Sequence, residues 1–398
     1  MGTPFQTTRL TTFPDELRVS RSLRAPELGP RILFLSGGSA LRALCRVLKQ
    51  YTHNSEHLIT AFDSGGSSAH LRRAFRMPAI GDLRNRIVAL ADESVRGNPQ
   101  IYRLFTHRLA HDAPAAALVR ELEQLISGEA SLVAAVPEPM RRIVQTLLRL
   151  FAERMPRDFD LRGANLGNLL LAGGYLSHSR DLESVLLLFS KLLEVRGMVR
   201  CIVDQDLHLC AELADGTRVV GQHLITGKEA TPIGSAIREL YLVDCLDAPR
   251  RASTDIAEQV RRSFSAADLI CYPMGSFYSS VVANLLPRGV GRAIASASGP
   301  RVYIPNTGHD PEQHGMSVAD SLEELLRYVR ADAGQDVPLG RVVNLVLLDR
   351  DPRHYGMPLE LERIERLGAQ VARLELVTES SRPHADPLRL TEALLSLA

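Results

Sequence analysis

Small and polar residues follow two short apolar runs near the start of the chain. The run Arg31–Leu35 leads into the tetrapeptide Ser36–Ser39, and the run Leu58–Phe62 leads into the hexapeptide Asp63–Ser68. Paired glycines in both loops allow the backbone to approach a ligand closely, and the free N–H groups at a following helix start attract an anion such as phosphate. A carboxylate at a strand end, here Asp63, can hold a metal ion, a hydroxyl group or a proton. The two loops therefore indicate a binding site for a phosphate-bearing ligand.

Further loops have the same character. The segment Gly81–Asn85 opens a predicted helix with Asp82 as its N-cap, and Arg84 and Asn85 lie in the first turn, where both side chains can reach one anion. Small and amide-bearing residues recur at 163–168, 273–280 and 305–308. If the strands of the sheet are parallel, these loops converge on one crevice at the carboxyl ends of the strands.

Short apolar runs alternate with helical patterns in the first and last parts of the chain. This alternation indicates an α/β fold, a Rossmann-like parallel sheet with helices on both faces. We expect a polar, loosely ordered extension (1–30), two parts of one α/β domain (31–91 and 236–398), a largely helical insertion (92–198) and a small β-hairpin region (199–235). In this division the run Val199–Val203 belongs to the small β region, and the run Glu239–Val243 belongs to the second part of the α/β domain.

Composition excludes several classes of protein. The formal net charge is +1, from 47 basic and 46 acidic residues, which argues against nucleic acid as a partner. The five cysteines form no CxxC pair, and no apolar run reaches the length of a membrane helix, so we expect a protein of the reducing cytoplasm with no membrane partner. His107 and His111 have the spacing of a zinc protease motif but lack its glutamate, and no motif indicates haem, zinc or an iron–sulfur cluster.

In order and spacing, the loops resemble the motifs of the CofD-type family, which includes 2-phospho-L-lactate transferase and the YvcK-type gluconeogenesis factors. The resemblance is closer to the YvcK-type branch and covers about residues 31–330. The segments that carry it are Gly37–Ala40, Phe62–Ala69, Ala79–Asn85, Leu166–Leu171, Glu194–Val199, Tyr272–Leu286 and Pro305–Asp320. The helical stretch 92–160 is longer than this branch leads us to expect.

The resemblance implies a small-molecule nucleotide ligand, GDP- or UDP-linked, and leaves two functions open. In the transferase branch, a phosphoryl-linked group passes from a nucleotide-linked donor to a hydroxyl acceptor with the help of a divalent cation, so Mg²⁺ is a candidate cofactor. In the YvcK-type branch, the protein binds a nucleotide sugar without catalysis and regulates carbon or cell-envelope metabolism. A homo-oligomer is compatible with both.

As an enzyme, the chain would use Asp63 to orient the acceptor hydroxyl or a magnesium ion and Arg84 to neutralise charge on the phosphoryl group. The residues expected to bind the nucleotide and its phosphates are Gly37, Gly38, Ser39, Gly65, Gly66, Ser67, Asn85, Asn168, Gly275, Ser276 and Asn306. Of these, Gly37, Gly38, Gly275 and Ser276 are expected to hold a diphosphate with their backbone N–H groups. Ser64 stands where the family has a second Asp, which removes a charge that could hold a cation. The chain also has no Trp, whereas the transferase branch carries one, and this difference argues against a deazaflavin acceptor.

Overall fold

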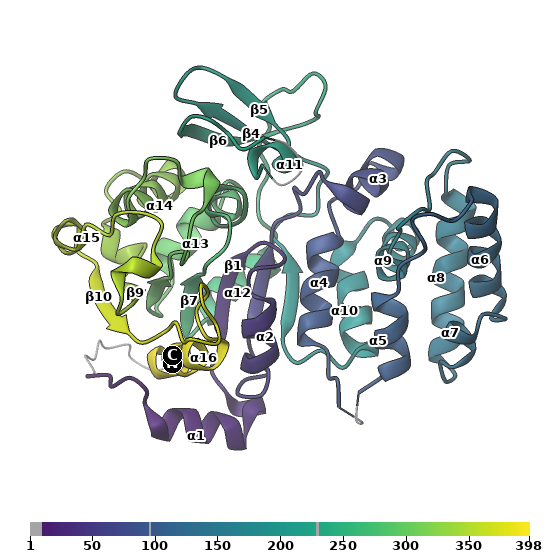
Figure 1. Ribbon diagram of the computed structural model, residues 1–398, viewed down its shortest axis with the longest axis horizontal. Helices are drawn as coiled ribbons and strands as arrows, with labels where there is room; N and C mark the ends of the chain where they lie inside the picture. Colours follow the sequence, from purple (N-terminus) through teal and green to yellow (C-terminus); the bar gives the residue numbers. More distant parts are fainter. Residues whose placement is uncertain (1–9, 95–96, 228–230) are drawn as a thin grey trace.

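The computed structural model describes residues 10–94, 97–227 and 231–398. It contains a parallel sheet of seven strands, a small antiparallel sheet of three strands and a segment of helices (Figure 1). The predicted fold class is therefore confirmed. The parallel strands are β1 (Ile32–Ser36), β2 (Glu56–Ile59), β3 (Met198–Cys201), β7 (Leu269–Tyr272), β8 (Arg301–Tyr303), β9 (Leu345–Asp349) and β10 (Gln370–Leu374). The antiparallel strands are β4 (His208–Leu213), β5 (Arg218–Val220) and β6 (Ile237–Val243).

The order of the parallel strands creates a crevice at the centre of the sheet. The order is β10-β9-β8-β7-β1-β2-β3, so the chain first builds outward from β1 to β3 and later returns to the other side of β1 with β7. Loops that leave β1 and β7 therefore diverge to opposite sides. Such a switch point is where ligands bind in open parallel sheets.

Each face of the sheet has its own hydrophobic core, because neighbouring strand residues point to opposite faces. In β1, Ile32 and Phe34 enter one core, while Leu33 and Leu35 enter the other. Helices of the first face are α2 (Arg42–Leu48), α4 (Gly81–Leu90) and α16 (Pro387–Leu397), and those of the second face are α12 (Glu258–Ala266), α13 (Val290–Ser296), α14 (Val318–Ala333) and α15 (Leu361–Leu367).

The helical segment shares the core of the first face. Phe105, Leu148 and Leu170 belong to the same cluster as Ile32 and Phe34. At its centre α9 is buried on nearly every side, with Leu166–Tyr175 inaccessible to solvent. The helices beyond the sheet are α3 (Gly66–Phe75), α5 (Pro99–Thr106), α6 (Ala115–Ser127), α7 (Ser131–Ala134), α8 (Met140–Arg154), α9 (Leu166–Ser177) and α10 (Leu182–Leu192). Among the described residues, no helix is both long and apolar enough to span a bilayer.

Two strands and one helix differ from the sequence-based assignment. β3 pairs with β2 and so forms the edge of the parallel sheet, although its sequence was grouped with the small β region. β6 pairs antiparallel with β4, although it was grouped with the α/β domain. Apolar runs do not encode their pairing partners, which explains both differences. The division into domains stays a prediction.

The N-terminal region contains a helix where loose structure was expected. In α1 (Glu16–Arg24), the Asp15 side chain caps the helix by accepting a hydrogen bond from the Arg18 N–H. The Asp15 N–H donates to Ser396 Oγ of α16 at 2.8 Å, so the two ends of the chain are joined (Figure 1). Capping by Asp15 and docking on α16 stabilise a helix whose apolar pattern is weak.

The close packing of α8 against α9 gives a test of the fold. A side chain at Gly173 would overlap the carbonyl oxygen of Leu147, so Gly173→Ala should destabilise the protein by about 1–3 kcal/mol through overpacking. Gly340→Ala is the matched control, because nothing lies within 4 Å of a Cβ built there. Chemical denaturation measures the free energy of unfolding of both variants. Equal stability of the two variants would contradict the packing described.

Candidate functional site

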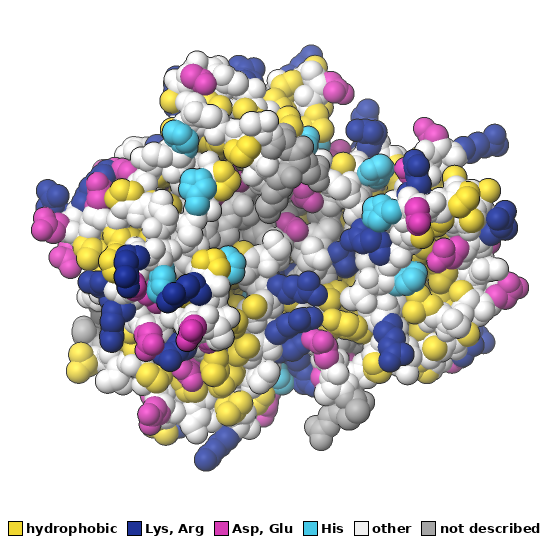
Figure 2. Space-filling view, viewed as in Figure 1, with side chains coloured by type: hydrophobic (Ala, Val, Ile, Leu, Met, Phe, Trp, Pro, Cys, Tyr) yellow, Lys and Arg dark blue, Asp and Glu magenta, His cyan; other side chains and the backbone are white. Residues whose placement is uncertain are grey.

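A cavity of about 430 Å³ opens at the carboxyl ends of β1, β2 and β7, at the switch point of the sheet. The molecular surface is hollowed between the parallel sheet and the helical segment, and Lys and Arg side chains gather near this hollow (Figure 2). All the residues predicted for the site except Asn306 line this cavity. They are Gly37, Gly38, Ser39, Asp63, Gly65, Gly66, Ser67, Arg84, Asn85, Asn168, Gly275 and Ser276. Their roles in binding and catalysis stay predictions.

A buried arginine supports the loop that follows β1. Arg86 is completely buried, and its Nη2 donates to the carbonyl oxygens of Gly37 at 2.8 Å and Gly38 at 3.4 Å. Its Nη1 donates to Cys45 Sγ at 2.7 Å. In the part of the chain that the structure describes, this guanidinium forms no ion pair. With the carbonyls drawn inward, the N–H groups of Gly37 and Gly38 donate to no acceptor of the described chain and remain available to a ligand.

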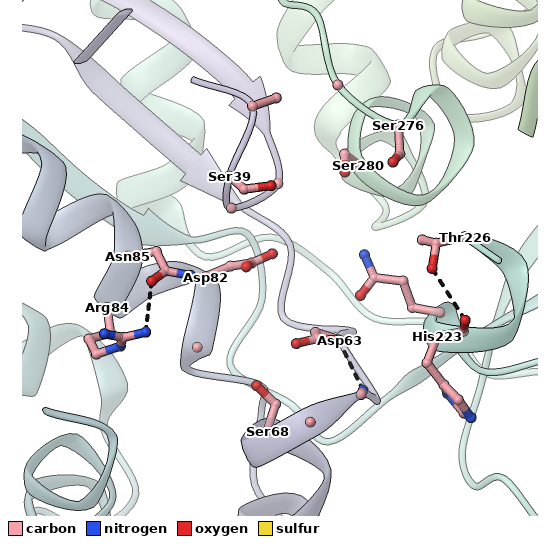
Figure 3. Close-up of a pocket in the computed structure, with 18 of the residues that line it drawn as sticks. Ser39, Asp63, Ser68, Asp82, Arg84, Asn85, His223, Thr226, Ser276 and Ser280 are labelled. Carbon is pink, nitrogen blue, oxygen red and sulfur yellow. Dashed lines mark hydrogen bonds between the residues drawn. The ribbon is translucent and has the colours of Figure 1, made fainter. Parts of the chain in front are cut away.

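Gly38 lies directly against the Asp82 carboxylate. A Cβ at Gly38 would overlap Asp82 Oδ1, so only glycine allows this approach. Asp82 is not the N-cap that the sequence predicted, because Ile80 occupies the N-cap position of α4. Ser39 likewise caps nothing, since the N-cap of α2 is Leu41 and makes no side-chain cap bond. In Figure 3, Asp82 and Asp63 both point into the cavity.

The loop after β2 positions Asp63. Its Oδ1 accepts a hydrogen bond from the Gly65 N–H at 3.0 Å, and its carbonyl oxygen accepts one from Arg72 Nη1 at 2.9 Å. Arg72 is itself held by an ion pair with Asp206 at 2.7 Å. The carboxylate of Asp63 therefore has a fixed orientation toward the cavity and keeps one oxygen available.

The wall formed by the helices carries two guanidinium groups. Arg84 is nearly buried; burial and the neighbouring charge of Arg108 lower the pKa of Arg84 to about 10. Its Nη2 donates to Asn85 Oδ1 at 2.7 Å, while its buried Nε finds no partner within the described ranges of the chain. Among the described residues, neither Arg84 nor Arg108 forms an ion pair. A bound anion would supply the missing partner.

In the loop after β7, the Gly275 N–H does not have the role that the sequence predicted for it, which was to hold a diphosphate. The Gly275 N–H already donates to Asn306 Oδ1 at 2.8 Å, so it is not available to a diphosphate. Asn306 does not line the main cavity but a neighbouring groove, where its Nδ2 donates to the Gly275 carbonyl oxygen at 2.6 Å. Asn306 is therefore a support for the loop. The Ser276 N–H donates to no acceptor of the described chain, and Ser276 lines the cavity.

Two buried carboxylates occupy the start of the helical turn Phe277–Val281 that follows this loop. Asp310 accepts from the Phe277 N–H at 2.8 Å, and Glu312 accepts from the N–H groups of Tyr278 and Ser279 at 2.9 and 2.8 Å. Burial and the charge of Asp310 raise the pKa of Glu312 to about 7, and burial also raises the pKa of Asp310. These acids are structural caps, so the free anion-binding end of a helix is absent here.

Several lining residues were not predicted, some because they come from segments that no motif marks and others because they lie in the predicted loops but were not assigned to the site. From α11 (Gln222–Ile225) and the residue after it come Gln222, His223 and Thr226; elsewhere in the chain lie Ser68, Asp82, Arg108, Met274 and Ser280. Ser64, the residue in place of the family's second Asp, bonds His223 Nδ1 at 2.7 Å. This bond ties α11 to the loop after β2. No motif in the sequence indicates this contact.

The described residues contain no group of three or more His, Cys, Asp or Glu side chains placed to hold a metal ion. Asp63 and Asp82 nevertheless point into one cavity (Figure 3). Magnesium is typically held by one or two carboxylates, several waters and the phosphates of a bound nucleotide. The two carboxylates therefore fit a magnesium ion that arrives with a phosphorylated ligand.

Comparisons with known proteins identify the family of the chain. The family model described as 2-phospho-L-lactate transferase CofD matches residues 32–377, and the chain belongs to the CofD family. A putative gluconeogenesis factor from Nostoc sp. is 30% identical over 298 residues, which are 75% of this chain and 52% of the relative. The chain thus spans about half the length of that relative. The gluconeogenesis factor of Bacillus subtilis is 26% identical over 364 residues, covering 88% of this chain and 92% of the relative.

A solved structure has the same fold. A UPF0052-family protein from Bacillus halodurans superposes with a TM-score of 0.66 at 24% identity, covering 92% of this chain and 99% of that chain.

The pKa of Glu312 predicts a pH dependence of stability. Its value is raised from 4.5 to about 7, so the folded protein holds a proton that the unfolded chain releases between these pH values. The proton on Glu312 stabilises the folded protein fully at low pH, and this stabilisation is lost as pH rises through this window. We expect Glu312→Gln to keep the bonds from Tyr278 and Ser279 and to remove a pH-dependent loss on the order of 2–3 kcal/mol. Chemical denaturation of both proteins at pH 5 and pH 8 measures the change in the free energy of unfolding between these pH values.

The exposed Glu379→Gln is the control for this experiment and should retain the wild-type pH dependence. If Glu312→Gln and wild type lose equal stability between the two pH values, Glu312 does not titrate in this window.

Proposed function

We propose that the chain binds a nucleoside-diphosphate-linked ligand, a nucleotide sugar, in the cavity at the switch point and acts as a binding regulator of the gluconeogenesis-factor type. One observation carries the proposal. Gly37 and Gly38, with free backbone N–H groups, and the guanidinium groups of Arg84 and Arg108, on the wall formed by the helices, line the same cavity. Free N–H groups and unpaired guanidiniums around one cavity are the donors that a diphosphate accepts from. Two relatives are named gluconeogenesis factors, which supports a role of that type.

The buried Arg86 beneath the β1 loop is a second observation in favour of this proposal. Its buried charge adds to the attraction that the two peptide N–H groups exert on an anion, because few solvent molecules screen it. The diphosphate is therefore assigned to the side of the cavity formed by β1 and α4. On the β7 side, Ser276 contributes an N–H, whereas Asp310 and Glu312 place negative charge behind it.

A transferase is the second candidate, and the fixed Asp63 carboxylate favours it. In that reaction the oxygen of an acceptor hydroxyl attacks the distal phosphorus, and the bond from that phosphorus to the bridging oxygen breaks. The nucleoside monophosphate leaves with the bridging oxygen and its electron pair. Asp63 accepts the proton of the hydroxyl, and Arg84 stabilises charge on the phosphoryl oxygens. Magnesium held by Asp63, Asp82 and the phosphates would supply further charge neutralisation.

Gly38→Val tests the location of the diphosphate. The new side chain would overlap the Asp82 carboxylate and block the approach of the phosphate to the loop, so binding of UDP and GDP should fall at least about 100-fold. Isothermal titration calorimetry measures affinity, and circular dichroism verifies the fold. Gly340→Ala again serves as control. Wild-type affinity in a folded Gly38→Val protein would place the diphosphate elsewhere.

Asp63→Asn separates the two functions. In a transferase, release of nucleoside monophosphate from a nucleotide-linked donor should fall by about 10²–10⁴-fold, with little change in nucleotide affinity. In a binding regulator, wild type releases no monophosphate. Asp63→Asn then strengthens metal-free binding, because a negative charge near the diphosphate is removed, and weakens any magnesium-dependent binding. Turnover by wild type with any donor and acceptor pair would replace the regulatory proposal by the catalytic one.

A further inference from the structure

A second cavity of about 210 Å³ lies beside the main one, between α3 and the loops around α5 and α9. The two cavities share four lining residues, Gly66, Ser67, Arg108 and Asn168. We call the second cavity the side pocket; its other lining residues are His70, Leu71, His111, Phe159, Asp160, Arg162, Gly163, Ala164, Asn165 and Leu169. Because the walls are shared, a ligand anchored in the main cavity can extend into the side pocket.

The walls of the side pocket are less polar than those of the main cavity. Leu71, Leu169 and Phe159 provide hydrocarbon and aromatic surface. The Phe159 ring is held from behind by Phe75 and Phe151, with ring centroids 6.1 and 5.6 Å away. Its orientation is therefore set before a ligand arrives, and the ring is a suitable wall for the hydrocarbon face of another ring.

Two of the three Asp, Glu, Lys and Arg side chains that line the side pocket neutralise each other, and the third, Arg108, is shared with the main cavity. Asp160 and Arg162 form a two-point pair, with Arg162 Nε and Nη2 donating to the carboxylate at 2.9 and 2.8 Å. Arg108, at the boundary with the main cavity, donates to the Gly163 carbonyl oxygen and lies where the phosphates would end. An uncharged group fits the pocket better than a second anion.

Asn168 gives a separate indication that a ligand with a hydrogen-bond donor binds in the side pocket. Its side chain is almost completely buried at the wall that both cavities share, and its Nδ2 donates to Ser67 Oγ at 3.1 Å. Its Oδ1 accepts no hydrogen bond from any residue that the structure describes. A buried acceptor without a partner costs free energy, so a ligand that donates a hydrogen bond at this point is stabilised.

We infer that the side pocket is the subsite for the sugar ring of the ligand, and that residues of the helical segment, Phe159 and His111 above all, select that sugar. The inference rests on the proposed function and adds where the sugar binds. A pyranose has a hydrocarbon face for Phe159 and hydroxyl groups that donate to Asn168 Oδ1. A purely hydrocarbon ring would leave that oxygen unpaired, and a second anion would meet the Asp160 carboxylate.

The test compares UDP with UDP-glucose and UDP-N-acetylglucosamine, and GDP with GDP-mannose, by calorimetry on the full chain. The measured quantity is the affinity ratio of each sugar nucleotide to its parent diphosphate. In wild type at least one sugar should raise this ratio above one. Phe159→Leu keeps apolar contact with Phe75 and Phe151 but removes the aromatic wall, and it should lower the ratio by about fivefold. His111→Ala, on an exposed loop, should lower it in the same direction.

Val119→Ala, on the outer surface of α6, is the control and should leave the ratio unchanged. If wild type binds neither UDP nor GDP, the proposed function fails and the subsite with it. If wild type binds a diphosphate but no sugar raises the ratio, the subsite is wrong while the proposed function stands. The same conclusion follows if a sugar raises the ratio and neither Phe159→Leu nor His111→Ala lowers it. A ratio lowered by both of these variants and not by Val119→Ala supports the inference.

Discussion

The hydrogen bonds from Arg86 to the carbonyl oxygens of Gly37 and Gly38 set the conformation on which the site depends. A fully buried guanidinium is costly unless its donors are satisfied, and in proteins the usual partner is a carboxylate. Here backbone carbonyls and a cysteine sulfur take that place, while Arg86 Nε finds no partner among the described residues. In a trans peptide unit the C=O and the N–H of the next residue point in opposite directions, so these bonds turn the N–H groups of Gly38 and Ser39 away from Arg86. The buried charge of Arg86 thus acts on the cavity through the orientation of the peptide groups of the loop.

The charges around the cavity are distributed unevenly, and this asymmetry follows from how each loop is supported. Arg86 supports the β1 loop, whereas Asp310 and Glu312 support the turn after the β7 loop. Arg86 therefore places positive charge behind the β1 loop, although the Asp82 carboxylate lies directly against Gly38, whereas the two acids neutralise the helix dipole on the β7 side. Two glycine-rich loops that look alike in sequence are thus supported by groups of opposite charge.

The sequence predicted the parallel sheet, the convergence of the loops and most of the glycine, serine and amide residues that line the cavity. These predictions depend on local signals, namely strands followed by small residues. The sequence did not predict Asp82 as a lining residue, the contribution of α11, or the use of the Gly275 N–H by Asn306. Each of these depends on contacts between residues far apart in the chain. The strands with which β3 and β6 pair were not predicted for the same reason, since pairing partners are set by tertiary structure.

The helical segment and the first face of the sheet are built around one hydrophobic core, and this continuity has a mechanical consequence. The wall with Arg84 and Arg108 cannot rotate away from the β1 loop without exposing side chains such as Phe105 and Leu170 to water. A hinge between the two walls would therefore be energetically expensive. A ligand that binds there as proposed would enter a preformed shape, with little ordering entropy lost at the moment of binding.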